Sequence, residues 1–351
     1  MSLIEKTGLR LLHLLEPEAA HDIGLKLLRA GLAGGRGPVQ SNRLKTNVAG
    51  IDLPNPIGIA AGFDKNAQAV PETLRTGAGF TEIGAVTPRP QFGNPKPRLF
   101  RLSSDRAVIN RFGFNNCGME AAYASLTARP VAGIVGVNLG ANKDTEDKSN
   151  DYMAVLSRFQ DIVDFATVNV SSPNTERLRD LQGRAAIDML LGRVLERRDE
   201  LGSGGKRLPI FLKIAPDLSL DNLSDIADVC LKRGIDAVVA TNTTLDRRGL
   251  RSAGWQEKGG LSGRPLFQRS TEVLKQLYRV SDGRLPLIGV GGISSGEDAY
   301  AKIRAGASAV QMYSALVYEG VSHTGRVAKD LRNILARDGY ASVAGAIGVD
   351  A

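Results

Sequence analysis

Apolar residues recur every three or four positions through residues 3–15, and Pro17 interrupts this spacing. The spacing resumes through residues 20–32, and a stretch rich in glycine and proline follows at 34–38. Such a pattern predicts two short amphipathic helices, each with an apolar face that needs a partner. Two interpretations remain open: the helices pack on the rest of the chain, or they dock into a membrane interface.

From about residue 50 the pattern changes to short apolar runs that alternate with stretches of helical spacing. Ser219 precedes one helical stretch that stops at Gly234, and Ser294 with Glu297 forms a predicted capping box for another, which ends at Gly306. This alternation predicts an α/β fold, a (β/α)8 TIM barrel with an N-terminal two-helix extension, and leaves a doubly wound sheet as the alternative. The eight predicted strands are 57–61, 80–84, 133–138, 165–170, 209–214, 236–241, 286–291 and 308–312.

Two predicted connections, 85–129 and 171–183, are too long to be plain linkers. Ordered loops of this length in compact domains often act as lids or binding loops. Residues 339–351 are mostly small and weakly patterned, so we expect them to fray. The chain therefore divides into a helical segment, 1–40, and a barrel domain, 41–351.

Composition and charge narrow the range of partners. The 351 residues include 45 Lys and Arg against 37 Asp and Glu, a formal net charge of +8. Such a charge can favour anionic lipid or anionic substrates, and a basic surface without a specific partner is an equal alternative. No long basic run with interleaved aromatic residues is present, so we predict no nucleic-acid partner. Neither a signal peptide nor an apolar run of about 18 residues, the length of a spanning helix, is recognisable, so we expect a reducing compartment.

Cysteine and histidine usage argues against metal chemistry. Cys117 and Cys230 form no CxxC pair, so neither a disulfide framework nor a cysteine-based metal site is predicted. His13, His21 and His323 lie far along the chain from the polar motifs described next. We therefore predict no metal site and no Ser-His-Asp triad.

Polar residues cluster where the predicted strands end. In a barrel the carboxyl ends of the strands meet at one face, where ligand sites are built. Several amide and amine side chains at this one face of the barrel favour a ligand site over the ordinary capping of loops. The residues are Lys65, Asn138, Asn169, Lys213, Thr241, Asn242 and Thr243.

Glycines follow the seventh predicted strand, at Gly289, Gly291 and Gly292, and Tyr313 and Ser314 end the eighth. The loops after these two barrel strands commonly bind phosphate through backbone N–H groups. The barrel interpretation therefore predicts a phosphorylated ligand or cofactor.

Lys213 is expected to point into the mouth of the barrel. A buried lysine is unfavourable unless it meets an anion or acts as a base or Schiff-base amine. A flavin accumulates negative charge when it is reduced, so a fixed cation assists its reduction. A Schiff-base barrel lyase remains an alternative at this point.

Seven motifs together resemble those of dihydroorotate dehydrogenases, in the order and spacing of that family, from about residue 44 to 335. Seven motifs in sequence are far more specific than a single glycine loop. The motifs are AGFDK (61–65), NRFGFN (110–115), NVSSPN (169–174), KIAPD (213–217), TNTT (241–244), GGLSG (259–263) and GVGGI (289–293).

The resemblance extends to the quinone-dependent, membrane-associated branch of the family, called class 2. The helical segment 1–40 is similar to the quinone-tunnel helices of that branch, and Ser172 stands where the soluble class 1 enzymes carry cysteine. This resemblance implies a monomer on the cytoplasmic side of the cell membrane, bound peripherally, that oxidises dihydroorotate to orotate in pyrimidine biosynthesis. A class 1-like enzyme that uses fumarate or a nicotinamide is the near alternative, and a non-catalytic membrane-surface protein is the remote one.

The resemblance also implies roles for individual residues. Ser172 would remove the C5 proton, although a free serine hydroxyl is a poor base, with Thr175 and ordered water as a relay. Lys213 would stabilise the charge on the reduced flavin. The implied FMN contacts are Ala61, Gly62, Lys65, Ala85, Asn138, Asn169, Lys213 and Thr241 at the ring and ribityl chain, with Gly263, Gly292, Tyr313 and Ser314 at the phosphate. The implied dihydroorotate contacts are Lys65, Asn110, Arg111, Phe112, Gly113, Phe114, Asn169, Asn174, Asn242 and Thr243.

Three positions depart from the pattern of the family. Ala85 stands where many members carry threonine, so a hydroxyl contact to the flavin would be lost there. Phe63 and Phe112 replace leucine or methionine, which exchanges one apolar side chain for another.

Overall fold

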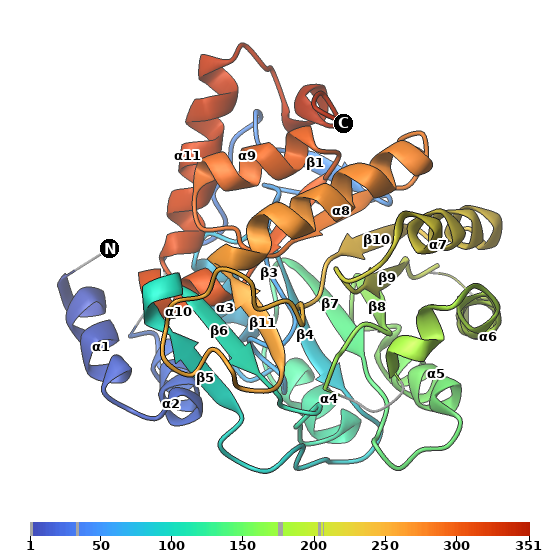
Figure 1. The fold of residues 1–351 in the computed structure, drawn as a ribbon, viewed down its shortest axis with the longest axis horizontal. Helices are drawn as coiled ribbons and strands as arrows, with labels where there is room; N and C mark the ends of the chain where they lie inside the picture. Colours follow the sequence, from blue (N-terminus) through green and yellow to red (C-terminus); the bar gives the residue numbers. More distant parts are fainter. Residues whose placement is uncertain (1–2, 33–34, 175–177, 203–204, 206) are drawn as a thin grey trace.

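Eight parallel strands close into a barrel, and neighbours along the chain are neighbours around it (Figure 1). The computed structural model describes residues 3–32, 35–174, 178–202, 205 and 207–351. Each predicted strand overlaps one barrel strand, so the predicted fold class is confirmed and the doubly wound alternative is wrong. The strands are β3 (Ile57–Ile59), β4 (Phe80–Val86), β7 (Ile134–Leu139), β8 (Phe165–Asn169), β9 (Ile210–Ile214), β10 (Ala237–Ala240), β12 (Leu287–Val290) and β13 (Ala309–Met312).

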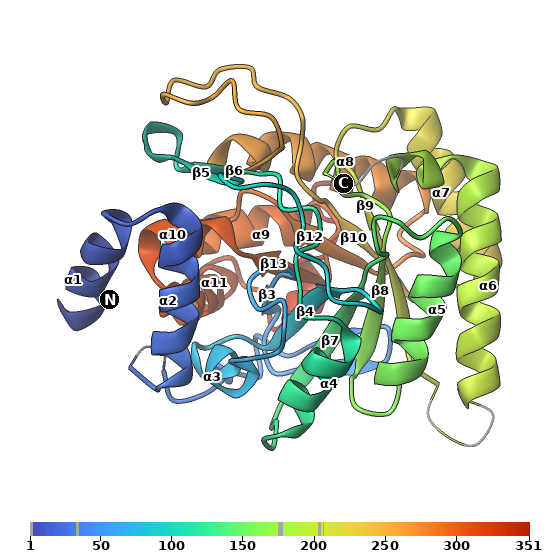
Figure 2. The ribbon, with the colours of Figure 1, turned by 90° about the horizontal axis from the view of Figure 1, so that it is seen from below.

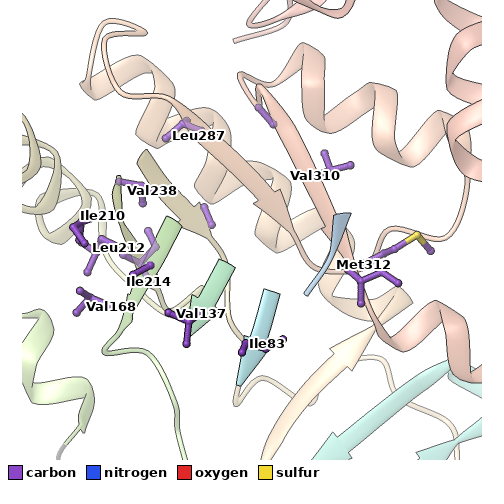
Figure 3. Packing of buried hydrophobic residues seen from close by; sticks show 14 of the residues in the cluster. Ile83, Val137, Val168, Ile210, Leu212, Ile214, Val238, Leu287, Val310 and Met312 are labelled. Carbon is purple, nitrogen blue, oxygen red and sulfur yellow. The ribbon is translucent and has the colours of Figure 1, made fainter. Parts of the chain in front are cut away.

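A helix follows each strand on the outside of the barrel. Strand side chains such as Val137, Val168 and Val238 belong to the buried cluster that packs against these helices (Figure 3). The helices are α3 (Val70–Arg75), α4 (Met119–Thr127), α5 (Lys148–Phe159), α6 (Arg184–Gly202), α7 (Leu220–Arg233), α8 (Phe267–Val280), α9 (Gly296–Arg304), α10 (Ser314–Glu319) and α11 (His323–Arg337).

Helix capping follows the predicted signals at α7 and shifts by one residue at α9. Ser219 Oγ accepts a hydrogen bond from Asn222 N, and α7 ends at Gly234 as predicted. At α9, however, the N-cap is Ser295, whose Oγ accepts from Asp298 N. The predicted capping box at Ser294 is therefore wrong, because Ser294 instead donates to the Asp298 carboxylate.

Alternate side chains along each strand point into the barrel, where they pack in layers. Phe80, Phe165 and Phe211 belong to the cluster inside the barrel, and the rings of Phe165 and Phe211 stack with centroids 4.7 Å apart. Glycines give these rings room, since a Cβ on Gly136 would lie 2.1 Å from Phe165. Two residues beyond Phe211 on β9, Lys213 points inward as well, toward the carboxyl ends of the strands.

Two small sheets cover the ends of the barrel. Val48 and Leu53, from the hairpin of β1 (Thr46–Val48) and β2 (Ile51–Leu53), join the cluster inside the barrel. The connections predicted to be long loops supply much of the second sheet and contain structure of their own. That antiparallel sheet consists of β5 (Leu99–Leu102), β6 (Ala107–Asn110) and β11 (Gly260–Gly263). The connection 171–183 contains the 3-10 helix η2 (Leu178–Gln182).

The N-terminal extension is a pair of helices, α1 (Leu3–His13) and α2 (Pro17–Arg29), beside the barrel near α10 (Figure 2). Pro17 occupies the first turn of α2, where its missing N–H removes no helical hydrogen bond. Leu25 and Leu28 are buried in the main core, so α2 packs on the barrel domain. No helix in the described part of the chain is long and apolar enough to cross a membrane. Gly34 of the predicted linker lies outside the described residues.

The C-terminal residues pack against the domain rather than fraying. Val343 and Ala346, in the 3-10 helix η4 (Val343–Ala346), are fully buried in the main core. Asp350 pairs with Arg304 of α9. The expectation that residues 339–351 fray is wrong, because two small apolar side chains and one ion pair attach this segment to α9 and the core.

Candidate active site

A cavity of about 740 Å³ runs from the mouth of the barrel to the N-terminal helices. Nearly all of the predicted site residues line it, although they come from the ends of all eight barrel strands and from the sheet over the mouth. The lining includes Ala61, Gly62, Lys65, Ala85, Asn110, Phe112, Gly113, Phe114, Asn138, Asn169, Ser172, Asn174, Lys213, Thr241, Asn242, Thr243, Gly263, Gly292, Tyr313 and Ser314.

Arg111 is the one predicted substrate contact that does not line the cavity in the described structure. Its Nη1 lies 2.6 Å from Glu257 Oε2, its Nη2 donates to Pro97 O at 2.9 Å, and its guanidinium stacks on Phe100. Alternation along the extended segment after β6 explains this, since Asn110 and Phe112 face the cavity and the residue between them faces away.

A chain of hydrogen bonds fixes the amides at the floor of the cavity. Glu82, only 1% exposed, accepts from Asn138 Nδ2 and from Gln311 Nε2, both at 2.6 Å. Asn138 Oδ1 in turn accepts from Asn169 Nδ2 at 2.8 Å. The Glu82 carboxylate therefore orients Asn138 and Asn169 before a ligand binds, which is the preorganisation that polar catalytic sites require.

Lys213 is a buried cation beside these amides, paired across the β8–β9 ladder with Asn169. Burial lowers the pKa of its ammonium, and the charge of Glu82 opposes that shift. Among the described residues no carboxylate lies within 4 Å of its Nζ. A buried cation without a direct partner is unfavourable, so this position fits a ligand that carries or develops negative charge.

Lys65 and His21 meet on the side of the cavity toward α2. The Lys65 Nζ lies 3.7 Å from the centroid of the Phe112 ring, and burial lowers its pKa to about 8 against the opposing charge of Glu18. The His21 ring packs edge-on against Phe63, 5.8 Å between centroids. Burial and the nearby Lys65 charge lower the pKa of His21 to about 4, so this imidazole is neutral near pH 7.

Sequence reasoning missed His21 and Glu82. His21 shares the helical spacing of the buried Leu25 and Leu28, which places it on the packed face of α2 and was the available signal. Glu82 interrupts a strand that is otherwise apolar or small, and an acidic residue at an inward position there was a second signal.

Ser172 lies on the loop after β8 and is 6% exposed. Its Oγ accepts a hydrogen bond from Asn174 N at 3.2 Å, which leaves the hydroxyl proton free. Asn174 Nδ2 then donates to Asn110 Oδ1 at 3.2 Å and ties this loop to β6. No histidine or carboxylate of the described residues hydrogen-bonds Ser172, and Thr175, the predicted relay residue, lies outside them.

The far end of the cavity forms an anion cradle of backbone groups. Gly263 and Gly292 have φ of 93° and 77°, which favour glycine. A Cβ on Gly292 would lie 2.5 Å from Phe267 N, so this loop touches the N-terminus of α8. Ser314 Oγ donates to Ser262 Oγ at 2.8 Å beside it. Helix N-termini and glycine loops of this kind bind phosphate.

These features fit a flavin mononucleotide. The buried Gln311 Oε1 has no hydrogen-bond partner in the described structure and lies on the cavity floor, where it can accept from a ligand N–H. Lys213 supplies a cation at the same depth, and the glycine cradle at the far end suits a phosphate. Within the described ranges, no group of three His, Cys, Asp or Glu side chains could hold a metal ion.

The cavity continues between the N-terminal helices. Leu9, Leu12 and Leu25 line this part, and Arg101 of β5 reaches across it to donate to Leu12 O at 3.3 Å and to Leu15 O. This branch of the cavity is therefore apolar with a few polar groups, His21 and Arg101 among them.

Comparison with known proteins identifies relatives over nearly the whole chain. A family model described as dihydroorotate dehydrogenase matches residues 43–335. A dihydroorotate dehydrogenase (quinone) of Cereibacter sphaeroides is 57% identical over 349 residues, 99% of this chain and 98% of the relative. One of Rhizobium johnstonii is 49% identical, covering 95% of this chain and 92% of the relative. The crystal structure of DHODH from Eimeria tenella in complex with ferulenol superposes with a TM-score of 0.91 at 40% identity, covering 95% of each chain.

Proposed function

The chain belongs to the dihydroorotate dehydrogenase family, and we propose on that basis how its residues carry out the reaction. The protein is an oxidoreductase that oxidises dihydroorotate to orotate with a quinone as electron acceptor, a step in pyrimidine biosynthesis. The observation that carries the assignment of the site is the buried Lys213 among oriented amides, in one cavity with Ser172 and the N-terminal helices.

The flavin is FMN, and it supplies hydride acceptance and electron transfer to the quinone. The residues that hold its ring and ribityl chain are Ala61, Gly62, Lys65, Ala85, Asn138, Asn169, Lys213 and Thr241, and those at its phosphate are Gly263, Gly292, Tyr313 and Ser314. Ala85 has no hydroxyl, so the polar contacts at the floor would come from Lys213, Asn138, Asn169 and Gln311.

Dihydroorotate binds under the sheet over the mouth. Amide side chains suit its amide and imide edges, and the Lys65 ammonium suits its carboxylate. The residues assigned to it are Lys65, Asn110, Phe112, Gly113, Phe114, Asn169, Asn174, Asn242 and Thr243. Arg111 holds the loop through Glu257 and Pro97 instead of contacting the substrate.

Ser172 is the proposed base. Its Oγ would take the proton from C5 as the C5–C6 double bond of orotate forms, and FMN bound in the cavity would supply the acceptor for the hydride from C6. The buried Lys213 would stabilise negative charge on a reduced flavin, an electrostatic effect of about 3 kcal/mol in comparable sites. The hydrogen bonds from Asn169 to Asn138 and from Asn138 to Glu82 hold both amides in place, so they need not reorganise as that charge develops.

Residues 1–40 form the quinone-access segment and residues 41–351 the FMN-binding barrel. The apolar branch between α1 and α2 admits the quinone, which leaves as the quinol after taking two electrons and two protons. Leu11 of α1, Leu14 after α1 and Leu32 after α2 are exposed, and exposed apolar side chains of this kind support peripheral binding to the cytoplasmic side of a membrane. The protein acts there as a monomer.

Anaerobic visible absorbance tests the proposal. The purified protein should show a flavin spectrum that bleaches with dihydroorotate and returns with a short-tailed quinone, but not with fumarate or NAD. A protein without flavin, or a flavin that dihydroorotate leaves oxidised, would refute it. Borohydride trapping of a substrate adduct on Lys213 would favour the Schiff-base alternative instead.

A further inference from the structure

Lys302 of α9 is a buried lysine that the reaction does not use. The side chain is fully buried between α8, α9 and β12. Its Nζ donates to Ser270 Oγ at 2.8 Å and to Thr271 Oγ1 at 3.0 Å, both in the first turns of α8. Lys302 does not line the cavity, so no ligand there touches it.

A short chain of hydrogen bonds connects Lys302 to the glycine cradle. Ser270 Oγ, which accepts from the lysine, donates to Gly291 O at 3.0 Å. Gly291 has φ of 112° and precedes Gly292, whose Cα approaches the N-terminus of α8. The carbonyl of Gly291 is thus held by α8, while Gly291 and Gly292 themselves line the cavity.

The other end of the same loop is held independently. Ser294 N and Oγ both donate to Asp298 Oδ2 at 2.8 Å. His323 Nε2 lies 2.8 Å from Ser294 O and donates to it. Because Asp298 is already engaged by Ser294, it does not neutralise Lys302 by direct contact.

The electrostatics of Lys302 are unfavourable without an anion nearby. No carboxylate of the described residues lies within 4 Å of its Nζ, and the first turn of α8 adds the positive end of a helix dipole. Burial lowers the pKa of Lys302 to about 7, while the charge of Asp298, on its own helix, opposes the shift. The helix end and the ammonium both raise the potential at the cradle, where a phosphate dianion would be stabilised.

We propose that Lys302 is a positioning residue for the phosphate of the flavin, acting through Ser270 on the Gly291–Gly292 loop and supplying a buried positive charge behind it. The inference rests on the proposed function, because it takes the phosphate of FMN as the anion.

Reconstitution of the full-length protein with FMN or with riboflavin, which lacks the phosphate, tests this role. The dissociation constants follow from quenching of flavin fluorescence. Lys302→Met, similar in volume and apolar, should weaken the binding of FMN about tenfold, equivalent to ~1.4 kcal/mol, and change the binding of riboflavin less than about twofold. Ser270→Ala keeps the ammonium but breaks the link to Gly291, and should weaken FMN selectively by a smaller factor.

Lys232→Met removes an exposed lysine of α7 and is the matched control, with no expected change for either flavin. Equal weakening of FMN and riboflavin in Lys302→Met would show a purely structural role and overturn the proposal, as would unchanged FMN binding. Wild-type protein that binds neither flavin would instead refute the assigned cofactor. If wild type and Lys302→Met both prefer FMN over riboflavin by the same factor, only the role of Lys302 is overturned.

Discussion

Glu18 of α2 and Arg98, the residue before β5, form a buried ion pair between the N-terminal extension and the barrel. Glu18 Oε1 lies 2.6 Å from Arg98 Nη2, and each side chain is 7% exposed. Arg98 also donates to Asn94 O at 2.9 Å and approaches the Phe112 ring. The pair therefore joins the quinone-access segment to the loop over the substrate site.

Replacing Glu18 with glutamine should lower the free energy of unfolding by about 3 kcal/mol, because a buried Arg98 charge then lacks its partner. Quinone turnover should fall more than flavin reduction, since α2 lines the quinone branch. Urea unfolding and the two half-reactions measure these effects. Glu120→Gln, which breaks the exposed pair with Arg158, is the matched control, with a loss under about 1 kcal/mol.

The effect of Glu18→Gln should depend on pH. Burial raises the pKa of Glu18, but the hydrogen bonds and charge of Arg98 outweigh it and hold this pKa below its ordinary value. The stabilisation is therefore complete above the ordinary glutamate pKa and is lost as pH falls through the lowered one. Wild type and variant should converge in stability in acid, and a difference that persisted there would contradict this account.

Ser172→Ala should slow flavin reduction by dihydroorotate by about 10²–10⁴-fold, the contribution typical of a general base. Reoxidation by quinone should stay unchanged, because Ser172 takes no part in it. Stopped-flow absorbance separates the two steps. Ser172→Cys restores an ionisable group at the same atom and should recover part of the rate, whereas a normal rate of reduction in Ser172→Ala would exclude this residue as the base.

Lys65 should make the affinity for dihydroorotate depend on pH. Its pKa of about 8 means that the free enzyme loses this positive charge above that pH, so KM should rise there. Lys65→Met should show a higher KM that no longer rises over the same range. Initial rates across the range, at constant ionic strength, provide the measurement, and an identical KM profile in both proteins would rule out the assigned contact.

Lys65 should also make the free energy of unfolding depend on pH. Its folded-state pKa lies below the value of about 10.4 for an unfolded chain, so between these values the unfolded state binds more protons. The free energy of unfolding therefore gains a contribution that rises with pH from about 8 to 10, and Lys65→Met should lack this contribution. Denaturant titrations of the two proteins at several pH values would reveal it.

The exposed leucines of the extension should determine membrane binding. Leu14 and Leu32 are 82% and 67% exposed, and replacing both with glutamine should reduce sedimentation with vesicles that contain anionic lipid. Flavin reduction in solution should not change. Met189, which is 66% exposed, is the matched control, because it belongs to α6, the helix on the opposite side of the barrel from α1 and α2 (Figure 1). Equal loss on Met189→Gln would show that the binding is not specific to the extension.

Much of the fold was predictable because its signals are local. Apolar runs of strand length and the cap at Ser219 depend on neighbouring residues alone, so they placed the eight strands and the start of α7. The motif residues were predictable for the same reason: each follows a strand, and a parallel barrel brings all such positions to one face.

Side-chain direction and long-range pairing were decided only by the tertiary structure. Arg111 belongs to a motif yet faces away from the cavity, and its partner Glu257 lies 146 positions along the chain. Pairs such as Glu18 and Arg98 are 80 positions apart in sequence, and burial brings them together only once the barrel has closed. Sequence by itself determined the elements and the chemistry at their ends, since these follow local patterns. The fold decided which charges meet and which remain unpaired, because electrostatic energies depend on burial and distance.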